Sequence, residues 1–340
     1  MRKLSTIQKI KEILPIEGAD AIELVIVNGW KVVVAKNVGH KVGDYVIYCE
    51  IDSFLPIKEE FEFLRKSSYK KMADGSEGFR LRTIKLRGQV SQGLIIPINV
   101  LMNYKNFIIE FEEGSDVSEI LGITKYEPPI PAELSGKVKG LFPSFIRKTD
   151  EERVQNLSKE YEGYKKEKFY VTEKLDGSSA TFYYKDGVFG VCSRNLELLE
   201  TDDNTFWKFA KQSDLENKLA KLNRNICLQG EIIGEGIQGN PYKIKGQTVK
   251  FFTGFDIDKQ DRIFFLEFVV LLQNLSLDYV PVLNQEYGFE LPDTIEDLLK
   301  YAEGKSALNP NTEREGVVIR SLDGSISFKA ISNKFLLNEK

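Results

Sequence analysis

Short runs of β-branched and aromatic residues, separated by turn sequences, dominate the first hundred residues of the chain. These runs are Ser5–Pro15, Ile22–Val27, Trp30–Ala35 and Tyr45–Glu50. Glycine-containing pairs such as Asn28-Gly29 stand between them and are typical of tight turns. Strands of this length and spacing can bury only one face each, so they predict a small β-barrel or sandwich rather than a layered α/β domain.

An OB-fold barrel fits this region best once Gly93–Ile98 is added as a closing strand. The run Gly18-Ala19-Asp20, then the GWKVVV stretch that begins at Gly29, then Gly43-Asp44, resembles the OB modules of tRNA-binding proteins. This resemblance implies a nucleic-acid-binding role for the first domain.

A basic segment, Phe79–Gln89 (FRLRTIKLRGQ), is expected as one further strand of this domain. Because side chains alternate along a strand, Arg80 and Arg82 would share one face, and Lys85 and Arg87 the other. Such cations can contact the phosphates of a single strand. A solvated charged strand explains the same pattern, and the sequence leaves both interpretations open.

Composition places the chain among ordinary globular proteins. It has 340 residues, 42% of them hydrophobic and 29% charged, and its length suggests two domains. No window is long and apolar enough for a membrane span and the N-terminus lacks a signal-peptide pattern, so we expect a cytoplasmic or nuclear protein that is not secreted. Cys49, Cys192 and Cys227 form no CxxC pair, and the single His40 argues against zinc and Ser-His-Asp sites.

The boundary between the two domains is expected at residues 126–144. The surrounding sequence, KYEPPIPAELSGKVKGLFPS, contains four prolines and two glycines and has no hydrophobic period, which is typical of a linker. Residues 1–125 then form the OB-fold domain and residues 145–340 the second domain. An acidic stretch, Thr149–Glu152, has the composition of a helix start and predicts that the second domain begins with a helix.

A strand-like pattern in the second domain, Phe169–Ser179 (FYVTEKLDGSS), stops at a lysine that is followed by a carboxylate and a glycine. Lys174 should therefore lie where a strand ends. A lysine ammonium has a pKa of about 10.4, so it attacks an electrophile at neutral pH only when neighbouring cations or a metal favour loss of its proton. Alone, a K-x-D-G sequence fits an exposed hairpin lysine better than a nucleophile.

Five further stretches give Lys174 a chemical context. A strand pattern with a turn at Asp186-Gly187 predicts a hairpin that brings Arg194 beside Lys174. Glu231 interrupts the buried run ICLQGEIIG, where an unpaired charge would be costly. Later come the run FFTGFDI and Glu315 at the head of GVVIR, and Lys329 follows near the C-terminus.

The order KLDGS, SRN, GEI, FFTGFDI, EGVVIR and SFKA resembles the covalent nucleotidyltransferases, which include polynucleotide ligases and RNA capping enzymes. The N-terminal module, KTDEERVQN and SFKAISNKFLL resemble the ATP-dependent RNA ligases that carry an OB domain ahead of the catalytic domain. The resemblance implies an α+β protein, in which an OB-fold barrel precedes a nucleotidyltransferase (adenylation) domain of antiparallel sheets with flanking helices.

The resemblance also implies a reaction. AMP passes from ATP to Lys174, then to the 5′-phosphate of RNA, and a 3′-hydroxyl displaces it to seal the strand. Lys174, Lys329 and Arg194 would be the catalytic cations, because each step develops negative charge at phosphorus. Many ligases carry a K-x-K pair in the last motif, whereas Ile331 stands here at the second position, so the role of Lys334 as a replacement stays open.

Acidic and aromatic residues complete the implied site. Asp176, Glu231 and Glu315 would supply oxygen ligands for Mg²⁺ or Mn²⁺. Phe252 would stack on the adenine, and Glu231 would contact either the ribose or the metal. A core position is the simpler interpretation for Phe252 and Phe255, because FFTGFDI also has the composition of a buried strand.

The expected partner is RNA with 3′-hydroxyl and 5′-phosphate ends in a nicked duplex, bound by a monomer. One alternative is a DNA ligase or a GTP-using capping enzyme, but those place an OB domain after the last lysine, where this sequence has only a short tail. The other is a non-catalytic RNA-binding protein, which would be expected to have lost charged pocket residues.

Overall fold

The computed structural model describes residues 2–72, 75–104, 112–127, 137–284 and 288–338. The chain forms two compact units. The first comprises Met1–Pro129, Val154–Glu162 and Leu336–Lys340, and the second comprises Ile130–Arg153 and Gly163–Phe335. Within the described ranges, no helix is both long and apolar enough to cross a membrane.

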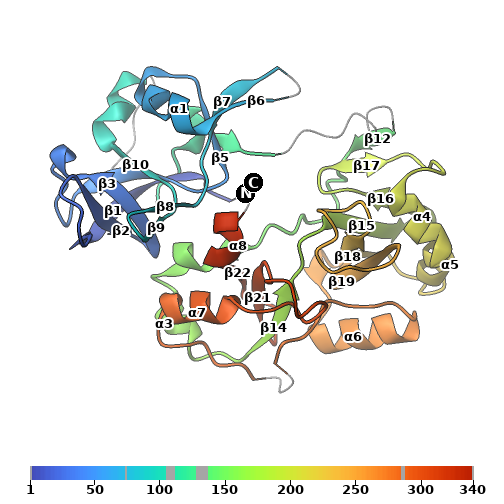
Figure 1. The fold of residues 1–340 in the computed structure, drawn as a ribbon. Helices are drawn as coiled ribbons and strands as arrows, with labels where there is room; N and C mark the ends of the chain where they lie inside the picture. Colours follow the sequence, from blue (N-terminus) through green and yellow to red (C-terminus); the bar gives the residue numbers. More distant parts are fainter. Residues whose placement is uncertain (1, 73–74, 105–111, 128–136, 285–287, 339–340) are drawn as a thin grey trace. The chain divides into compact units, whose positions relative to one another are not determined.

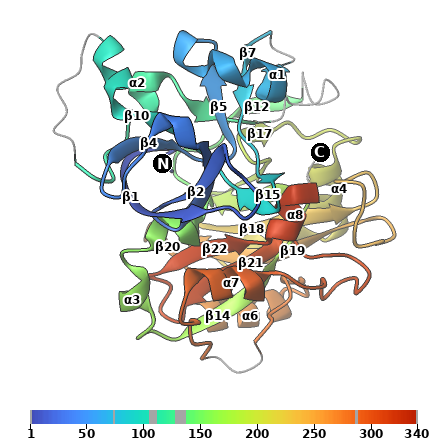
Figure 2. The ribbon, with the colours of Figure 1, turned by 60° about the vertical axis from the view of Figure 1, so that its left-hand side comes forward.

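The first unit contains the predicted β-barrel. Its five-stranded antiparallel sheet has the order β10-β4-β1-β2-β3 and curls round on itself (Figure 1, Figure 2). These strands are β1 (Ser5–Pro15), β2 (Ile22–Val27), β3 (Trp30–Ala35), β4 (Tyr45–Cys49) and β10 (Leu94–Pro97). The amide of Gln92 donates to the carbonyl of Lys31 at 2.8 Å and closes the barrel between β3 and the chain that enters β10. Burial alternates along the first half of β3, whereas four consecutive residues of β4, residues 46–49, are buried. Short apolar runs between turn sequences, rather than strict alternation, therefore explain why the sequence predicts this barrel.

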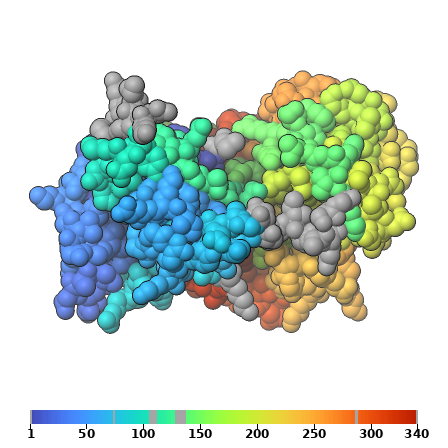
Figure 3. Space-filling view, turned by 90° about the horizontal axis from the view of Figure 1, so that it is seen from above, coloured from blue at the N-terminus to red at the C-terminus, as the bar shows by residue number. Residues whose placement is uncertain are grey.

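A second, four-stranded sheet lies in the same unit and shares its core with the barrel. Its order is β11-β5-β7-β6, formed by β5 (Ser53–Pro56), β6 (Tyr69–Lys71), β7 (Glu77–Arg80) and β11 (Thr124–Lys125). The short helices of the unit are η1 (Lys36–Val38), η2 (Glu59–Leu64), α1 (Arg65–Ser68), η3 (Ile98–Asn103) and α2 (Ser118–Leu121). Ile7 and Ile47 of the barrel pack in one cluster with Phe61 and Phe79. In Figure 3, both parts form one continuous blue-to-cyan surface.

The basic segment predicted as a single strand is divided. The strand β7 ends at Arg80, and a separate hairpin follows, formed by β8 (Ile84–Leu86) and β9 (Gln89–Ser91). Arg80 is 8% exposed and packs its guanidinium 4.2 Å from the ring centroid of Tyr126, so the expectation that it shares a phosphate-binding face with Arg82 is wrong. Arg82, Lys85 and Arg87 remain exposed, and Arg87 lies in the turn with a φ of +47°.

The acidic stretch near residue 150 does not start a helix. Glu152–Arg153 forms β13, which pairs in parallel with β22 (Ser327–Ile331) of the second unit. Pairing with a strand far along the chain outweighs the helix-start composition of the local sequence. Arg153 is 4% exposed in this arrangement.

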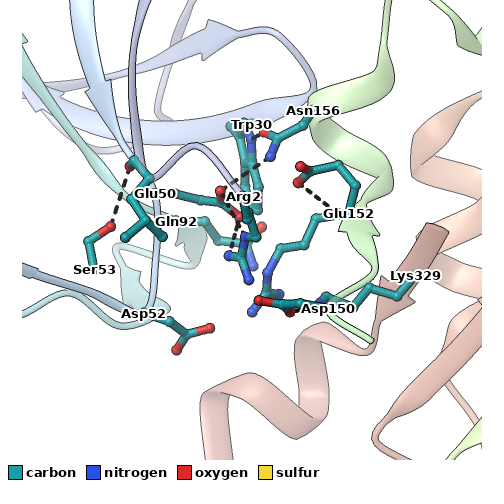
Figure 4. Close-up of polar contacts among 12 residues, drawn as sticks. Arg2, Trp30, Glu50, Asp52, Ser53, Gln92, Asp150, Glu152, Asn156 and Lys329 are labelled. Atoms are coloured by element: carbon teal, nitrogen blue, oxygen red, sulfur yellow. Dashed lines mark hydrogen bonds and ion pairs between the residues drawn. The ribbon is translucent and has the colours of Figure 1, made fainter. Parts of the chain in front are cut away.

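The chain then returns to the first unit through residues 154–162, where η5 (Val154–Leu157) packs on the barrel. The indole nitrogen of Trp30 donates to Oδ1 of Asn156 at 2.5 Å, and Asn156 Nδ2 donates to Glu50, which also pairs with Arg2 (Figure 4). A Cβ on Gly29 would lie 2.8 Å from the carbonyl oxygen of Gln155, so only glycine permits this close approach.

The second unit contains two sheets (Figure 1). The larger has the order β12-β17-β16-β15-β18-β19-β20, and the smaller has the order β13-β22-β21-β14. The strands not yet given are β12 (Val138–Leu141), β14 (Phe169–Lys174), β15 (Ser178–Lys185), β16 (Val188–Cys192), β17 (Leu196–Leu198), β18 (Ile226–Gly234), β19 (Gln247–Asp256), β20 (Asp261–Arg262) and β21 (Gly316–Ser321). All pairings except that of β13 are antiparallel, which confirms the predicted α+β class.

Helices flank these sheets. They are α4 (Thr205–Gln212), α5 (Leu215–Ala220), α6 (Phe265–Asn274) and α7 (Ile295–Ala302), with α3 (Tyr161–Tyr164) and α8 (Asn333–Asn338) at the divisions between the units. The largest core cluster joins Phe182 and Phe251 of the seven-stranded sheet to Leu215 of α5 and Phe268 of α6. This packing fixes the large sheet, and the chain leaves the small sheet at Lys174 to enter the large one at Ser178.

Residues 128–136 of the expected linker, residues 126–144, lie outside the described part of the chain. Its later part is not linker-like, because Val138–Leu141 forms the edge strand β12 beside β17. An edge strand needs only one partner, so a short run flanked by proline and glycine suffices.

Candidate active site

Lys174 is the last residue of β14 and pairs in register with Gly316 of β21. Its ammonium lies 2.6 and 2.7 Å from the two carboxylate oxygens of Glu315. The side chain of Lys174 is 29% exposed and that of Glu315 is 15% exposed. A strand-end lysine is therefore held by a carboxylate at the edge of the small sheet, where the strand pattern predicts it to be.

The register of the small sheet puts Lys174 and Lys329 on one face. Lys174 is opposite Gly316, which is opposite Ile331, and Thr172 is opposite Val318, which is opposite Lys329. Paired residues point to the same face of a sheet and alternate residues return to it. Ile331, which stands where many ligases have a second lysine, shares this face but is 3% exposed and apolar.

Asp150 connects two of the predicted cations. Its Oδ1 accepts a hydrogen bond from Lys329 Nζ at 3.2 Å (Figure 4). The same oxygen lies 3.7 Å from a guanidinium nitrogen of Arg194. Lys329 is 10% exposed, whereas Lys334 is 60% exposed on α8 and pairs with Glu303. Sequence reasoning treated Asp150 only as part of a helix start and so missed it, although its neighbours in the KTDEERVQN stretch carry the family resemblance.

Glu151, the next residue, holds this segment in place. Its Oε1 accepts hydrogen bonds from Arg262 and Arg320, both at 3.1 Å, and these arginines belong to β20 of the large sheet and β21 of the small one. Burial raises the pKa of Glu151, but the two guanidinium groups outweigh burial and hold that pKa below its usual value. A charged Glu151 therefore ties the segment that carries Asp150 to both sheets.

Arg194 follows the hairpin of β15 and β16, which turns at Asp186-Gly187 as predicted. The predicted pairing with Lys174 is wrong, because Lys174 belongs to the other sheet and the hairpin begins at Ser178. The last pair of the hairpin is Thr181 opposite Cys192, and Arg194 lies in the bend that follows β16. Its contact with Asp150 links it to Lys329 instead.

Glu231 lies on β18 opposite Ser179. Burial raises its pKa to about 8, the charges of Glu315 and Asp176 act in the same direction, and Lys174 and Arg194 oppose them. The same carboxylates act on the nucleophile candidate. Burial lowers the pKa of Lys174, but Glu315, Glu231 and Asp176 outweigh burial and raise it. The lowering of this pKa by neighbouring cations and a bound metal stays a prediction.

Asp176, Glu231 and Glu315 lie within electrostatic range of one another but do not form a direct ligand cage. Across the described residues, no group of three or more His, Cys, Asp or Glu side chains has the geometry to hold a metal ion. Their mutual repulsion, which helps to raise the pKa of Glu231, is the kind that a divalent cation relieves. The donor set, all carboxylate, suits a hard cation whose remaining ligands are water or phosphate oxygens.

Phe252 is the extra residue of a β-bulge. Gln229 pairs with Thr253 and Gly230 pairs with Phe251, so Phe252 has no opposite residue on β18. A bulge changes the direction of a side chain, and bulges are common beside active sites. Phe251 and Phe255 are buried in core clusters, as the core interpretation predicts for Phe255. Phe252 is half-buried and packs against the small apolar cluster that contains Leu175 and Tyr242.

The turn after Lys174 depends on Gly177. A Cβ there would lie 2.4 Å from the carbonyl oxygen of Ile232 on β18, so only glycine allows the turn to lie against that strand. This close approach gives a physical reason for the glycine of the K-x-D-G sequence. Tyr242, whose hydroxyl accepts a hydrogen bond from the amide of Asp176, was missed because its loop carries no strand or helix pattern.

Family models match both parts of the chain. Residues 4–98 match the model of an OB-fold domain family, and residues 167–334 match that of the RNA ligase family. No curated protein sequence matches the chain significantly.

Solved structures extend the similarity over the full length. A Naegleria gruberi RNA ligase mutant with AMP and Mn is 47% identical with a TM-score of 0.91, and the match covers 99% of each chain. Another mutant of that ligase, with ATP and Mn, is 47% identical over 99% of each chain with a TM-score of 0.90, and the ligase with PPi is 47% identical over 99% of this chain and 98% of that one, also at 0.90. The chain therefore belongs to the RNA ligase family, in a branch that carries an OB-fold domain ahead of the ligase domain.

Proposed function

We propose that this protein is an ATP-dependent RNA ligase that seals a 3′-hydroxyl to a 5′-phosphate through a lysyl-AMP intermediate at Lys174. The observation that carries the proposal is the shared face of the small sheet, on which Lys174 at a strand end lies with the buried Lys329. Membership of the RNA ligase family and neighbours solved with ATP or AMP and Mn support it.

The reaction has three displacements at phosphorus. First, Nζ of Lys174, as a neutral amine, attacks the α-phosphorus of ATP; an N–P bond forms and pyrophosphate leaves. Next, an oxygen of the RNA 5′-phosphate attacks the same phosphorus, the N–P bond breaks and Lys174 is released. Finally, the 3′-hydroxyl loses its proton and attacks the 5′-phosphorus, and AMP leaves as the strand is sealed.

Cationic side chains are proposed to bind the phosphates in these steps. Lys329 and Arg194 carry the charges, and Asp150 keeps both in one place. When bound, Mg²⁺ or Mn²⁺ would neutralise charge on the phosphates and draw carboxylate charge away from the Lys174 ammonium. Glu315, Glu231 and Asp176 are the residues that would hold it, with Glu231 also a candidate for the ribose.

Adenine recognition is assigned to Phe252. The ring lies at the bulge and is half-buried against the apolar cluster that contains Leu175, the residue after Lys174, whereas its neighbour Phe251 is fully buried. A half-buried aromatic ring can offer one face to a flat base.

The proposed substrate is a nicked RNA duplex bound by a monomer, and the proposal is tested by sealing. A 5′-labelled nicked RNA duplex should be sealed with ATP and Mg²⁺ or Mn²⁺, and an adenylylated RNA intermediate should appear when the nick carries a 3′-deoxy end. GTP should not replace ATP. Sealing of an all-DNA nick at the same rate, or with GTP, would contradict the proposed specificity.

The exposed basic residues of the first unit are proposed to contact RNA phosphates. Arg82 and Arg87 lie before and within the β8–β9 hairpin, so the double mutant Arg82→Ala/Arg87→Ala should weaken binding of nicked RNA. Loss of two phosphate contacts should flatten the slope of log affinity against log salt by about two units.

The charge-matched control for that hairpin is Lys41→Ala/Lys66→Ala, which removes two exposed lysines from other parts of the same unit. Binding of a fluorescent nicked RNA across a salt series measures both mutants. Equal slopes for the two double mutants would remove the hairpin from the RNA interface.

A further inference from the structure

The loop of residues 235–246, between β18 and β19, contacts the turn that follows Lys174. The hydroxyl of Tyr242 accepts a hydrogen bond from the amide of Asp176 at 2.6 Å. A weaker contact, 3.4 Å long, joins Nε2 of Gln238 to the carbonyl oxygen of Gly177. One loop thus contacts both residues through which the chain passes from the small sheet to the large one.

Tyr242 is built into the interior. It is 5% exposed and packs with Leu175, Ile233 and Val280 in one apolar cluster. Leu175 is the residue between Lys174 and Asp176, so the ring of Tyr242 packs on the turn while its hydroxyl binds the backbone of the turn. Buried hydroxyl groups need hydrogen-bond partners, and here the partner is an amide beside the proposed nucleophile.

The loop has a fixed shape of its own. Three residues other than glycine, Gln238, Asn240 and Lys243, have φ values of +46°, +49° and +54°. The side chain of Asn240 closes the loop, because it donates to the carbonyl of Ile244 and accepts from the amide of the same residue. Backbone conformations of this kind persist only where the surroundings hold them.

A second segment connects the loop to the other side of Lys174. The carbonyl oxygen of Pro241 accepts hydrogen bonds from Asn309 Nδ2 and Thr312 Oγ1, both at 2.8 Å. In the same segment, the amide of Ala307 donates to Oε2 of Glu173 at 2.7 Å. Glu173 and Asp176 flank Lys174 and Leu175. Glu173 is bonded to the second segment and Asp176 to the loop, and the two segments are bonded to each other at Pro241.

We propose that Tyr242 is a positioning residue for the nucleophile: its hydroxyl fixes the Lys174–Gly177 turn and so sets where Lys174 Nζ meets the α-phosphorus. This inference rests on the proposed function. It predicts that Tyr242 matters in the two steps that make and break the bond between Lys174 and phosphorus, and not in the final step, which Lys174 does not enter.

The test compares Tyr242→Phe with wild type in single-turnover assays. Tyr242→Phe removes one oxygen and leaves the amide of Asp176 without its acceptor, so the turn shifts. Displacement of a reacting group by about 1 Å costs up to about 100-fold in rate, so we expect lysyl-AMP formation to slow by about 10- to 100-fold. The ATP concentration for half-maximal rate should be unchanged, because Tyr242 acts on the nucleophile and not on the nucleotide.

The final step is measured separately by sealing a nicked RNA that already carries AMP on its 5′-phosphate. Tyr242→Phe should seal this RNA within about 2-fold of the wild-type rate, because Lys174 is not a reactant. Equal loss in both assays, or wild-type rates in both, would overturn the inference. Absence of lysyl-AMP in the wild-type protein would instead refute the proposed function, so the two failures are distinguishable.

Two further mutants guard against a general loss of structure. Tyr183→Phe is the matched control, because Tyr183 is also buried in the second unit and its hydroxyl bonds to Glu197 at 2.6 Å, in a different apolar cluster. Its rates should match wild type. Gln238→Ala removes the exposed second contact with the turn, and its slower lysyl-AMP formation, by a few-fold, should also spare the final step.

Discussion

Replacing Lys174 with alanine should abolish the covalent AMP label that wild-type protein acquires from ATP and a divalent metal. No other lysine lies at a strand end against Glu315 with Lys329 on the same face of the sheet, as far as the described residues show. The intact mass of wild-type protein should rise by one AMP, and the mass of the mutant should not change. A label that persists, or that maps by peptide mass to another residue, would make the assignment of the nucleophile wrong.

Lys174→Arg tests the chemistry of the group rather than its charge. Arginine keeps the ion pair with Glu315, but a guanidinium does not give up a proton at working pH, so this mutant should also stay unlabelled. The wild-type rate should rise with pH between about 6 and 9, because the raised pKa of Lys174 lies above this interval and the neutral fraction of the amine grows with each unit of pH. A rate that falls over this interval would contradict attack by the neutral amine.

Lys329→Ala should suppress lysyl-AMP formation by about 100-fold or more, a loss typical for removal of a group that stabilises charge in the transition state. Lys329 is buried on the proposed phosphate-binding face and bonds to Asp150. The matched control is Lys334→Ala, whose lysine is exposed and pairs with Glu303, and which should keep nearly the wild-type rate.

The comparison also addresses the missing second lysine of the last motif. Equal losses in the two mutants would mean that Lys334 supplies a second cation during the reaction, despite its pairing with Glu303. A wild-type rate in Lys329→Ala would make the assignment of the last motif wrong. Incorporation of label from ATP measures lysyl-AMP formation in each mutant. A melting curve for each mutant shows whether its fold is retained.

Local pattern predicted the parts of the molecule whose contacts are local. The barrel strands follow from short apolar runs between turn sequences, and Lys174 follows from a strand pattern that stops at K-x-D-G. The hairpin turn at Asp186-Gly187 has positive φ at both residues, which is what the sequence Asp-Gly permits.

Features set by distant partners could not be predicted in this way. Glu152–Arg153 is a strand only because β22 lies beside it, some 170 residues later in the chain. Phe251 and Phe252 are chemically identical, and only the bulge opposite β18 separates the core ring from the half-buried one. Arg194 pairs with Asp150 rather than lying beside Lys174, because the two belong to different sheets.

Packing of residues 154–162 on the barrel constrains the order in which parts of the chain can fold during synthesis on the ribosome. Among the described residues, the last strand of the first unit ends at Lys125, but Trp30 and Gly29 meet Asn156 and Gln155 only when that later segment emerges. Until then, the barrel groups that bond to residues 154–162 lack these partners. In sequence, this segment lies between β13 and β14, which are strands of the other unit.

Dividing the gene at the expected linker, residues 126–144, would therefore yield two incomplete protein fragments. A barrel fragment would lack its last segment, and a ligase fragment would carry residues 154–162 with no surface to receive them. Circular permutation or insertion of a foreign domain is better attempted at exposed turns such as Asp186-Gly187, which interrupt neither unit.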